Sequence, residues 1–179
     1  VMAWRTFFVY AAGVVVASGA PALVARLGSD RAAYNTMSYA AAAVILVDHA
    51  GLAGINDSKK LSANRREELY LRIARSGIVG IGLADEKQID ELNIYQATRL
   101  AMKKAVLNLS HTPNALLIDG PMRVDLALYQ KGIIQGDAKS ASIAAASIVA
   151  KVFRDHWMRQ LHEVYPDYAF HKHKGYGSA

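Results

Sequence analysis

Short apolar runs alternate with segments of helical periodicity along this chain. Residues 40–47 (AAAAVILV) are apolar and end in β-branched side chains, a pattern typical of a buried strand. Residues 78–84 (IVGIGLA) predict a second strand, whose glycines permit close approach of another backbone. Residues 115–119 (ALLID) predict a third strand that ends in an acid, and residues 132–135 a short fourth one. Strands separated by helices indicate an α/β domain.

Three helices are predicted between and after these strands. Ser62 stands where an N-cap belongs for a helix over 64–76, which Gly77 would end. In that helix Leu69 and Ile73 face inward and the arginines outward. Asn93 is predicted to cap a second helix over 94–109, with one face formed by Ile94, Ala97, Ala101 and Ala105.

The third predicted helix covers about residues 140–162 and ends at Tyr165-Pro166. One stripe of this helix is apolar, and charged side chains lie elsewhere on its surface. The small residues near its start should let it pack closely. The stripe comprises Ile143, Ala150, Phe153, Trp157 and Leu161, and the small residues are Ala138, Ser140, Ala144, Ala145 and Ala146.

Composition narrows the class of protein. Of the 179 residues, 53% are hydrophobic and 20% charged, which is typical of a folded globular domain rather than a disordered chain. The net charge of +6 favours polyanionic partners such as nucleic acid or an anionic membrane surface. The chain has no cysteine, which excludes disulfides and thiolate metal sites and fits a reducing cytoplasm.

The start of the chain permits several interpretations. Residues 6–25 carry no charged side chain, and Arg5 precedes them. An apolar stretch after a basic residue, followed by small residues at 17–20, resembles a signal peptide, and its length raises the question of a membrane span. A pair of buried strands, or sequence that does not belong to the fold, explains the same pattern.

Two acids hold positions suited to chemistry. Asp119 closes a predicted strand, and Asp137 lies between an apolar run and a helix start. Carboxylates that leave neighbouring strands at one end of a sheet can together bind a hard cation such as Mg²⁺. Two structural interpretations stay open: Asp137 favours a helix start by capping and dipole, and Asp119-Gly120 is typical of a turn.

Two polar segments suit contact with nucleic acid. Residues 56–60 (NDSKK) place amide, hydroxyl and ammonium donors in one loop, which fits phosphate oxygens. Residues 171–176 (HKHKGY) set basic and imidazole groups beside a tyrosine, which fits backbone contact and stacking on a sugar or base. Each segment is also typical of a solvated loop. The pair His171 and His173 lacks a third ligand nearby for zinc.

Five segments, in order and in register over about residues 40–177, resemble the ribonuclease HII (type 2 ribonuclease H) family. The resemblance implies an RNase H-like fold, a central mixed β-sheet flanked by helices. It also implies an endonuclease that cleaves the RNA strand of RNA–DNA hybrids and acts at single ribonucleotides in duplex DNA. Cleavage would be a two-metal-ion hydrolysis on the 5′ side of the ribonucleotide, with Mg²⁺ or Mn²⁺. The segments are GINDSKKLS, ELNIYQATRLAM, LLIDG, QGDAKSASIAAASIVAKVFRD and YPDYAFHKHKGYG.

The resemblance assigns roles to residues. Asp119 and Asp137 match two of the family's four metal-binding catalytic carboxylates, and Tyr176 matches the tyrosine that stacks on the sugar at the ribonucleotide–DNA junction. Asn56, Ser58 and Lys59 match groups that contact the phosphate backbone. The partners implied are RNA–DNA hybrid and ribonucleotide-containing duplex DNA, with no membrane, for a cytoplasmic monomer.

The first 39 residues depart from the family pattern. The family's first strand carries Asp-Glu-x-Gly-Arg-Gly, and alignments of this chain put Val15 and Val16, or Gly28 and Ser29, where the acids belong. We therefore expect residues 1–39 to be an aberrant segment and residues 40–179 to be the RNase H-like domain, truncated at its C-terminus. The alternative function is a catalytically impaired protein that binds hybrids without cutting them.

Overall fold

The computed structural model describes residues 7–10, 39–46, 52, 54–55 and 58–174. Five strands form one sheet in the order β3-β2-β1-β4-β5. β2 runs antiparallel to both of its neighbours, whereas β1, β4 and β5 are mutually parallel. The predicted mixed α/β sheet is thus confirmed. The strands are β1 Phe7–Tyr10, β2 Tyr39–Leu46, β3 Gly77–Ala84, β4 Ala115–Asp119 and β5 Tyr129–Ile133.

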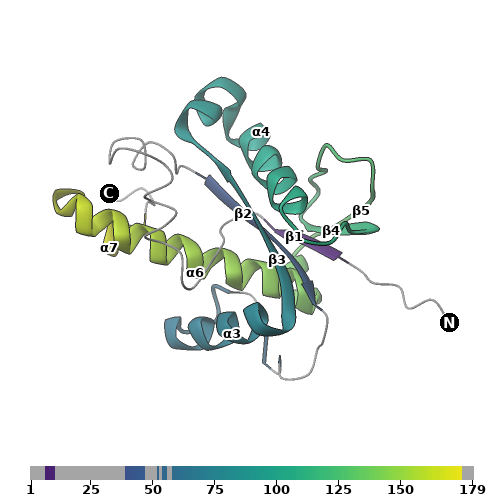
Figure 1. Ribbon diagram of the computed structural model, residues 1–179, viewed down its shortest axis with the longest axis horizontal. Helices are drawn as coiled ribbons and strands as arrows, with labels where there is room; N and C mark the ends of the chain where they lie inside the picture. Colours follow the sequence, from purple (N-terminus) through teal and green to yellow (C-terminus); the bar gives the residue numbers. More distant parts are fainter. Residues whose placement is uncertain (1–6, 11–38, 47–51, 53, 56–57, 175–179) are drawn as a thin grey trace.

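Helices cover both faces of this sheet, as Figure 1 shows. α4 (Glu86–Leu107) lies on one face, and α3 (Ala63–Ser76) and α6 (Ala141–Val164) lie on the other. The alternation of β2 explains this division, because Ala41 and Ala43 pack under α4 whereas Ala42 and Val44 pack under α3 and α6. Burial on both faces requires an apolar strand throughout, which is what the run at 40–47 predicted.

The glycines of β3 bring α4 unusually close to the sheet. A Cβ added to Gly82 would lie 1.9 Å from the carbonyl oxygen of Ala101, and one added to Gly80 would lie 2.2 Å from that of Ala105. Only a residue without a side chain fits at these two points. The close approach predicted from the glycines is confirmed.

α3 forms where the sequence predicted it. The Ser62 side chain accepts a hydrogen bond from the Arg65 backbone N–H at 3.3 Å, and Gly77 is the C-cap. Leu69 and Ile73 are fully buried. The expectation that all of its arginines face outward is wrong for one of them, because Arg66 is half-buried and bonds to the preceding loop.

α4 begins earlier than predicted. Asp85 and Gln88 form a capping box at its N-terminus, so helical structure precedes Asn93 by a full turn and more. Asn93 itself has φ 67°, and its side-chain oxygen accepts the backbone N–H of Tyr95 at 3.0 Å. Asn93 is therefore non-helical and divides α4 into two segments, and it caps the second one as predicted, while the first segment was not predicted.

Three predictions from periodicity need correction. Ile94 follows the kink and is 54% exposed, so it does not join the buried face of Ala97, Ala101 and Ala105. The fourth strand runs over 129–133 rather than 132–135, because pairing with β4 defines it. Of the small residues before and in the last long helix, Ala138 is exposed, whereas Ala144, Ala145 and Ala146 are buried as predicted.

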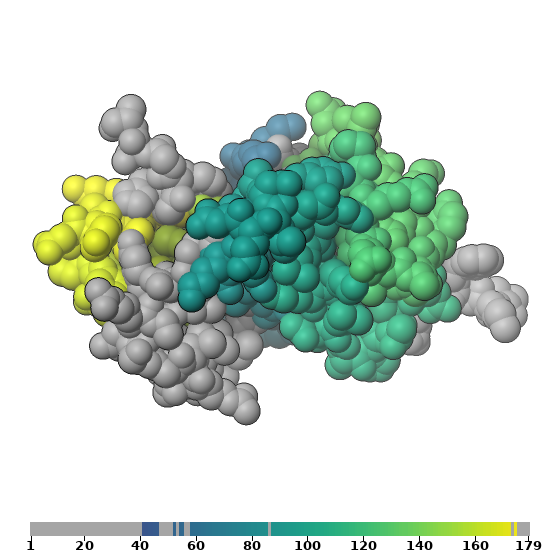
Figure 2. All heavy atoms as spheres, turned by 90° about the horizontal axis from the view of Figure 1, so that it is seen from above, coloured from purple at the N-terminus to yellow at the C-terminus, as the bar shows by residue number. Residues whose placement is uncertain are grey.

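The apolar stripe of α6 is confirmed, since all five of its predicted members are buried. A four-residue helix, α5 (Gly136–Lys139), precedes it, and the 3-10 turn η1 (Pro166–Tyr168) and α7 (Phe170–His173) follow it. The space-filling view places the β4–β5 segment beside α4 and the C-terminal segment at the opposite end of the molecule (Figure 2).

Of the first 39 residues, the structure describes β1 and the first residue of β2. β1 occupies the centre of the sheet, between β2 and β4. The other residues of the segment expected to be aberrant lie outside the described ranges, and so do Val15, Val16, Gly28 and Ser29. Among the described residues, no helix has the length and apolar character needed to cross a bilayer.

Candidate metal and nucleic-acid site

Asp119 leaves the sheet at the carboxyl end of β4. Gly120 follows with φ +79°, which turns the chain away from the strand, while its N–H still donates to the Ile133 carbonyl of β5 at 2.9 Å. The Asp119 carboxylate accepts a hydrogen bond from the backbone N–H of Gly136. A residue at the end of β4 is thereby joined directly to the start of α5.

Asp137 is the next residue in that short helix and is only 8% exposed. Gln135, with φ 55°, turns the chain into α5, and the side chains of Asp119 and Ile143 closely approach Gly136. A Cβ on Gly136 would lie 3.0 Å from the Asp119 Oδ1 and 2.6 Å from Ile143. The structure therefore brings the two acids predicted from the sequence to the same junction. Gly120 turns the chain after Asp119, and Asp137 lies in the first turn of a helix where the dipole favours it, but the N-cap of that helix is Gln135 and has no side-chain cap hydrogen bond.

Both acids at this junction are of the residue type that binds a hard cation. Carboxylate oxygens are the ligands that Mg²⁺ prefers, and this ion is commonly held by one or two carboxylates together with water and phosphate. Within the described residues there is no group of three or more His, Asp or Glu side chains that could hold a metal. β1, which runs beside β4, has the sequence FFVY and adds no acid.

The turn at residues 58–61 precedes α3 and carries the first basic segment. Lys59 and Lys60 are exposed there. Ser58 is 4% exposed, and its Oγ lies 2.7 Å from the Oγ of Ser147 on α6. That buried contact favours a role for Ser58 in holding the turn, and its contact with a phosphate stays a prediction. Asn56 lies outside the described residues.

The second basic segment packs back against α6. The Arg154 Nε donates to the Lys174 carbonyl at 3.0 Å, and the ring of His171 lies beside that of His162 on α6, with centroids 3.8 Å apart. Burial lowers the pKa of the Lys174 ammonium, although the nearby Asp155 carboxylate opposes that shift. Tyr176 lies outside the described residues, so its stacking role stays a prediction.

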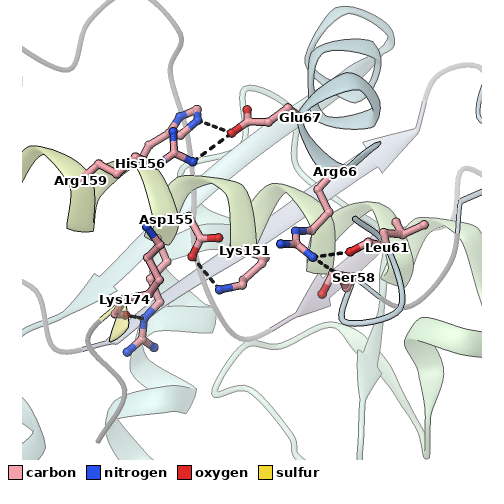
Figure 3. Close-up of polar contacts among 10 residues, drawn as sticks. Ser58, Leu61, Arg66, Glu67, Lys151, Asp155, His156, Arg159 and Lys174 are labelled. Atoms are coloured by element: carbon pink, nitrogen blue, oxygen red, sulfur yellow. Dashed lines mark hydrogen bonds and ion pairs between the residues drawn. The ribbon is translucent and has the colours of Figure 1, made fainter. Parts of the chain in front are cut away.

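Reasoning from the sequence missed the polar contacts along α6 (Figure 3). Asp155 is 8% exposed and pairs with Lys151 at 2.6 Å, and Glu67 of α3 bonds to His156 at 2.7 Å. The spacing of Lys151 and Asp155, four residues apart, was the available signal for the first pair. The second joins residues 89 positions apart, and no local pattern indicates such a contact.

The chain matches known proteins over most of its length. Residues 34–179 match the family described as ribonuclease HII. A ribonuclease HII of Bacillus pumilus is 53% identical over 139 residues, which are 77% of this chain and 54% of that protein. The chain thus spans about half the length of curated relatives that it matches.

Solved structures share the fold. In the PCNA:RNase HII complex from Archaeoglobus fulgidus, the matching chain has a TM-score of 0.69 and 24% identity, over 98% of this chain and 83% of that one. A Bst-RNase HIII structure in complex with Mn²⁺ gives a TM-score of 0.60 at 17% identity, over 90% of this chain and 56% of that one. These likenesses confirm the predicted RNase H-like fold.

Proposed function

The chain belongs to the ribonuclease HII family, and on that premise we propose that it is an endonuclease for ribonucleotides paired with DNA. Its substrates would be the RNA strand of RNA–DNA hybrids and single ribonucleotides embedded in duplex DNA. The observation that carries the proposal is the junction at which the Asp119 carboxylate accepts the N–H of Gly136, next to Asp137. A carboxylate at the end of a strand, next to a second one at the start of a helix, is what a metal-dependent phosphodiesterase needs in order to start building its site.

In this proposal Asp119 and Asp137 hold Mg²⁺ or Mn²⁺ against the scissile phosphate. When bound, two such ions stabilise the attacking and leaving oxygens of the hydrolysis. Asp119 is well placed for this role because the Gly136 N–H fixes one of its oxygens and so orients the carboxylate. The Mn²⁺ complex of a protein that shares the fold supports the choice of ion.

The basic segments would hold the duplex. Ser147, which contacts the first segment, and Arg154, which contacts the second, are seven residues apart on α6. At 1.5 Å of rise per residue they are separated by about 10 Å along the helix. The two segments are therefore supported at nearby points of one helix. We further propose that the protein acts as a monomer in the cytoplasm, where such duplexes occur.

A second function, binding without cleavage, has its own support. The described residues offer two carboxylates and no third ligand, and the described part of β1 carries no acid. Loss of carboxylates from a divalent site lowers both metal affinity and control over geometry. The two functions differ in one measurable respect, which is metal-stimulated product.

The test measures binding and cleavage on the same labelled substrates. A hybrid and a DNA duplex with one ribonucleotide are bound in EDTA, then supplied with Mg²⁺ or Mn²⁺, and the products are separated by electrophoresis. If the chain is an enzyme, Asp119→Asn and Asp137→Asn each lower the rate by about 100-fold or more, with little loss of binding. Asp125→Asn is the matched control, because Asp125 is exposed and pairs with Lys103.

The outcomes separate the two functions. Binding without metal-stimulated product, unchanged in both variants, would identify a hybrid-binding protein that does not cut. Failure to prefer either substrate over single-stranded RNA, together with no product, would contradict both.

A further inference from the structure

The turn at residues 58–61 is fixed to α6 by a buried contact. The Ser58 and Ser147 hydroxyls lie 2.7 Å apart, and their residues are 4% and 3% exposed. These residues are 89 positions apart in the sequence, so the contact joins the turn to a different part of the fold. A buried hydroxyl needs such a partner, since leaving it unpaired costs free energy.

A second contact holds both ends of the same turn. The Arg66 Nη1 donates to the Ser58 carbonyl at 2.9 Å and to the Leu61 carbonyl at 2.6 Å. Figure 3 shows this side chain reaching from α3 to the two carbonyls. One nitrogen therefore bridges the first and last residues of the turn.

The two residues between these ends are the exposed lysines. Lys59 and Lys60 project from a backbone that is fixed before and after them. A ligand that binds a fixed turn pays less of the entropy of ordering it than one that binds a flexible loop. The contacts of Arg66 and Ser147 thus bear on how well the lysines bind an anion.

We propose that Arg66 and Ser147 are positioning residues for nucleic-acid binding, which act by holding the turn that presents Lys59 and Lys60 to the phosphate backbone. This inference rests on the proposed function, in which that turn contacts the duplex. Arg66 acts through the turn because two carbonyls already engage its guanidinium, which is half-buried.

A double-mutant cycle on the full chain tests the proposal. The affinity for a fluorescein-labelled RNA–DNA hybrid is measured by anisotropy in EDTA, below the melting temperature of each variant. The variants are Arg66→Ala, the double substitution Lys59→Ala/Lys60→Ala, and all three together. Arg72→Ala is the matched control, since it removes the same charge from the same helix and Arg72 pairs with Glu68.

We expect Arg66→Ala to weaken binding about three- to tenfold beyond the effect of Arg72→Ala. In the background without the two lysines the same change should weaken binding by less than about twofold, because the groups it positions are gone. An equal loss in both backgrounds would mean that Arg66 acts independently of the lysines, and would overturn the proposal.

Two further variants keep the test decisive if Arg66→Ala unfolds. Arg66→Lys keeps one donor nitrogen, and both bonds to the turn among the described residues come from a single nitrogen, so it should recover most of the affinity. Ser147→Ala should weaken binding about two- to fivefold, again only when the lysines are present. Variants that melt at a lower temperature yet bind like the parent chain would show a purely structural role and contradict the proposal.

Two further outcomes separate failure of the positioning proposal from failure of the proposed function. If the lysine double variant binds as tightly as the parent chain, the turn is outside the interface and the positioning proposal falls while the proposed function stands. If the parent chain does not bind hybrid at all, the proposed function fails and the positioning proposal fails with it.

Discussion

Tyr70 of α3 faces α6, and two effects raise the pKa of its phenol there. The side chain is 3% exposed, and its ring meets that of His156 edge to face at 6.4 Å. Burial, with a smaller contribution from the charge of Glu67, raises the pKa of Tyr70 from 10.0 to about 12. Both effects disfavour the phenolate, so the folded state retains the proton at pH values where the unfolded state has lost it.

The raised pKa of Tyr70 makes the folded state less stable at alkaline pH. Below pH 10 the contribution of Tyr70 to stability is fully present, and it is lost as the pH rises from 10.0 to about 12. We expect that loss to reach about 2 to 3 kcal/mol. Tyr70→Phe should abolish it, so that the difference in unfolding free energy between parent and variant changes across this interval.

Urea unfolding at several pH values between 9 and 12 measures that difference. Tyr95→Phe is the control, since Tyr95 is 49% exposed. An alkaline loss of stability that is the same in the parent chain and in Tyr70→Phe would contradict the assignment.

Some residues could be predicted from the sequence because their signals are local. The Ser62 cap and the buried positions of Leu69 and Ile73 depend on neighbours within two turns of helix. Asp119 was found in the same way, as an acid at the end of an apolar run. Ser58 and Arg66 could not be placed, because the Ser58 hydroxyl has its partner on a distant helix and Arg66 turns inward to backbone carbonyls.

The same division between local and distant signals holds for the elements. β2 could be predicted because both of its faces are buried and it reads as an apolar run, and β3, buried on one face and half-buried on the other, reads as an apolar run as well. β5 is an edge strand with Tyr129 69% exposed, and only its pairing with β4 fixes its bounds. The start of α4 was missed although the capping box at Asp85 is visible in the sequence, because Asn93 offers a competing cap one helix segment later.

The close packing of α4 on β3 leads us to predict how a substitution at their contact changes stability. Gly82→Ala places a Cβ against the Ala101 carbonyl and the Ala105 amide of α4, both of them backbone atoms. A backbone cannot move aside as a side chain does, so α4 must shift, and we expect a loss of about 3 kcal/mol in unfolding free energy. Chemical denaturation monitored by circular dichroism provides the measurement.

Gly120→Ala is an informative comparison for that substitution. A Cβ on Gly120 meets nothing within 4 Å, but φ there is +79°, so the cost is conformational alone. We expect about 1 kcal/mol, clearly less than for Gly82→Ala. If Gly82→Ala is as stable as the parent chain, α4 does not pack as closely on β3 as the structure shows.

At the scale of the whole molecule, α6 connects the parts of the site. The acid junction lies just before its first turn, the turn at 58–61 contacts it at Ser147, and the C-terminal segment contacts it at Arg154. Its buried stripe fixes this helix to the sheet, so the spacing of the three parts is set by the core. The sequence showed each part separately, and only the fold shows their common support.

This arrangement predicts how binding responds to salt. The net charge is +6, and three lysines in the two basic segments, Lys59, Lys60 and Lys172, are exposed. If each neutralises one phosphate, the logarithm of the association constant for a hybrid should fall with the logarithm of salt concentration with a slope of about −3. Lys59→Ala/Lys60→Ala should reduce the steepness by about two, and Lys172→Ala by about one.

Anisotropy titrations over a series of KCl concentrations, in EDTA, give these slopes. Lys87→Ala, an exposed lysine outside both segments, should leave the slope unchanged. A slope near zero in the parent chain would show that these lysines neutralise no phosphate. Equal effects from all of the lysines, Lys87 included, would show that net charge rather than the two segments along α6 attracts the duplex.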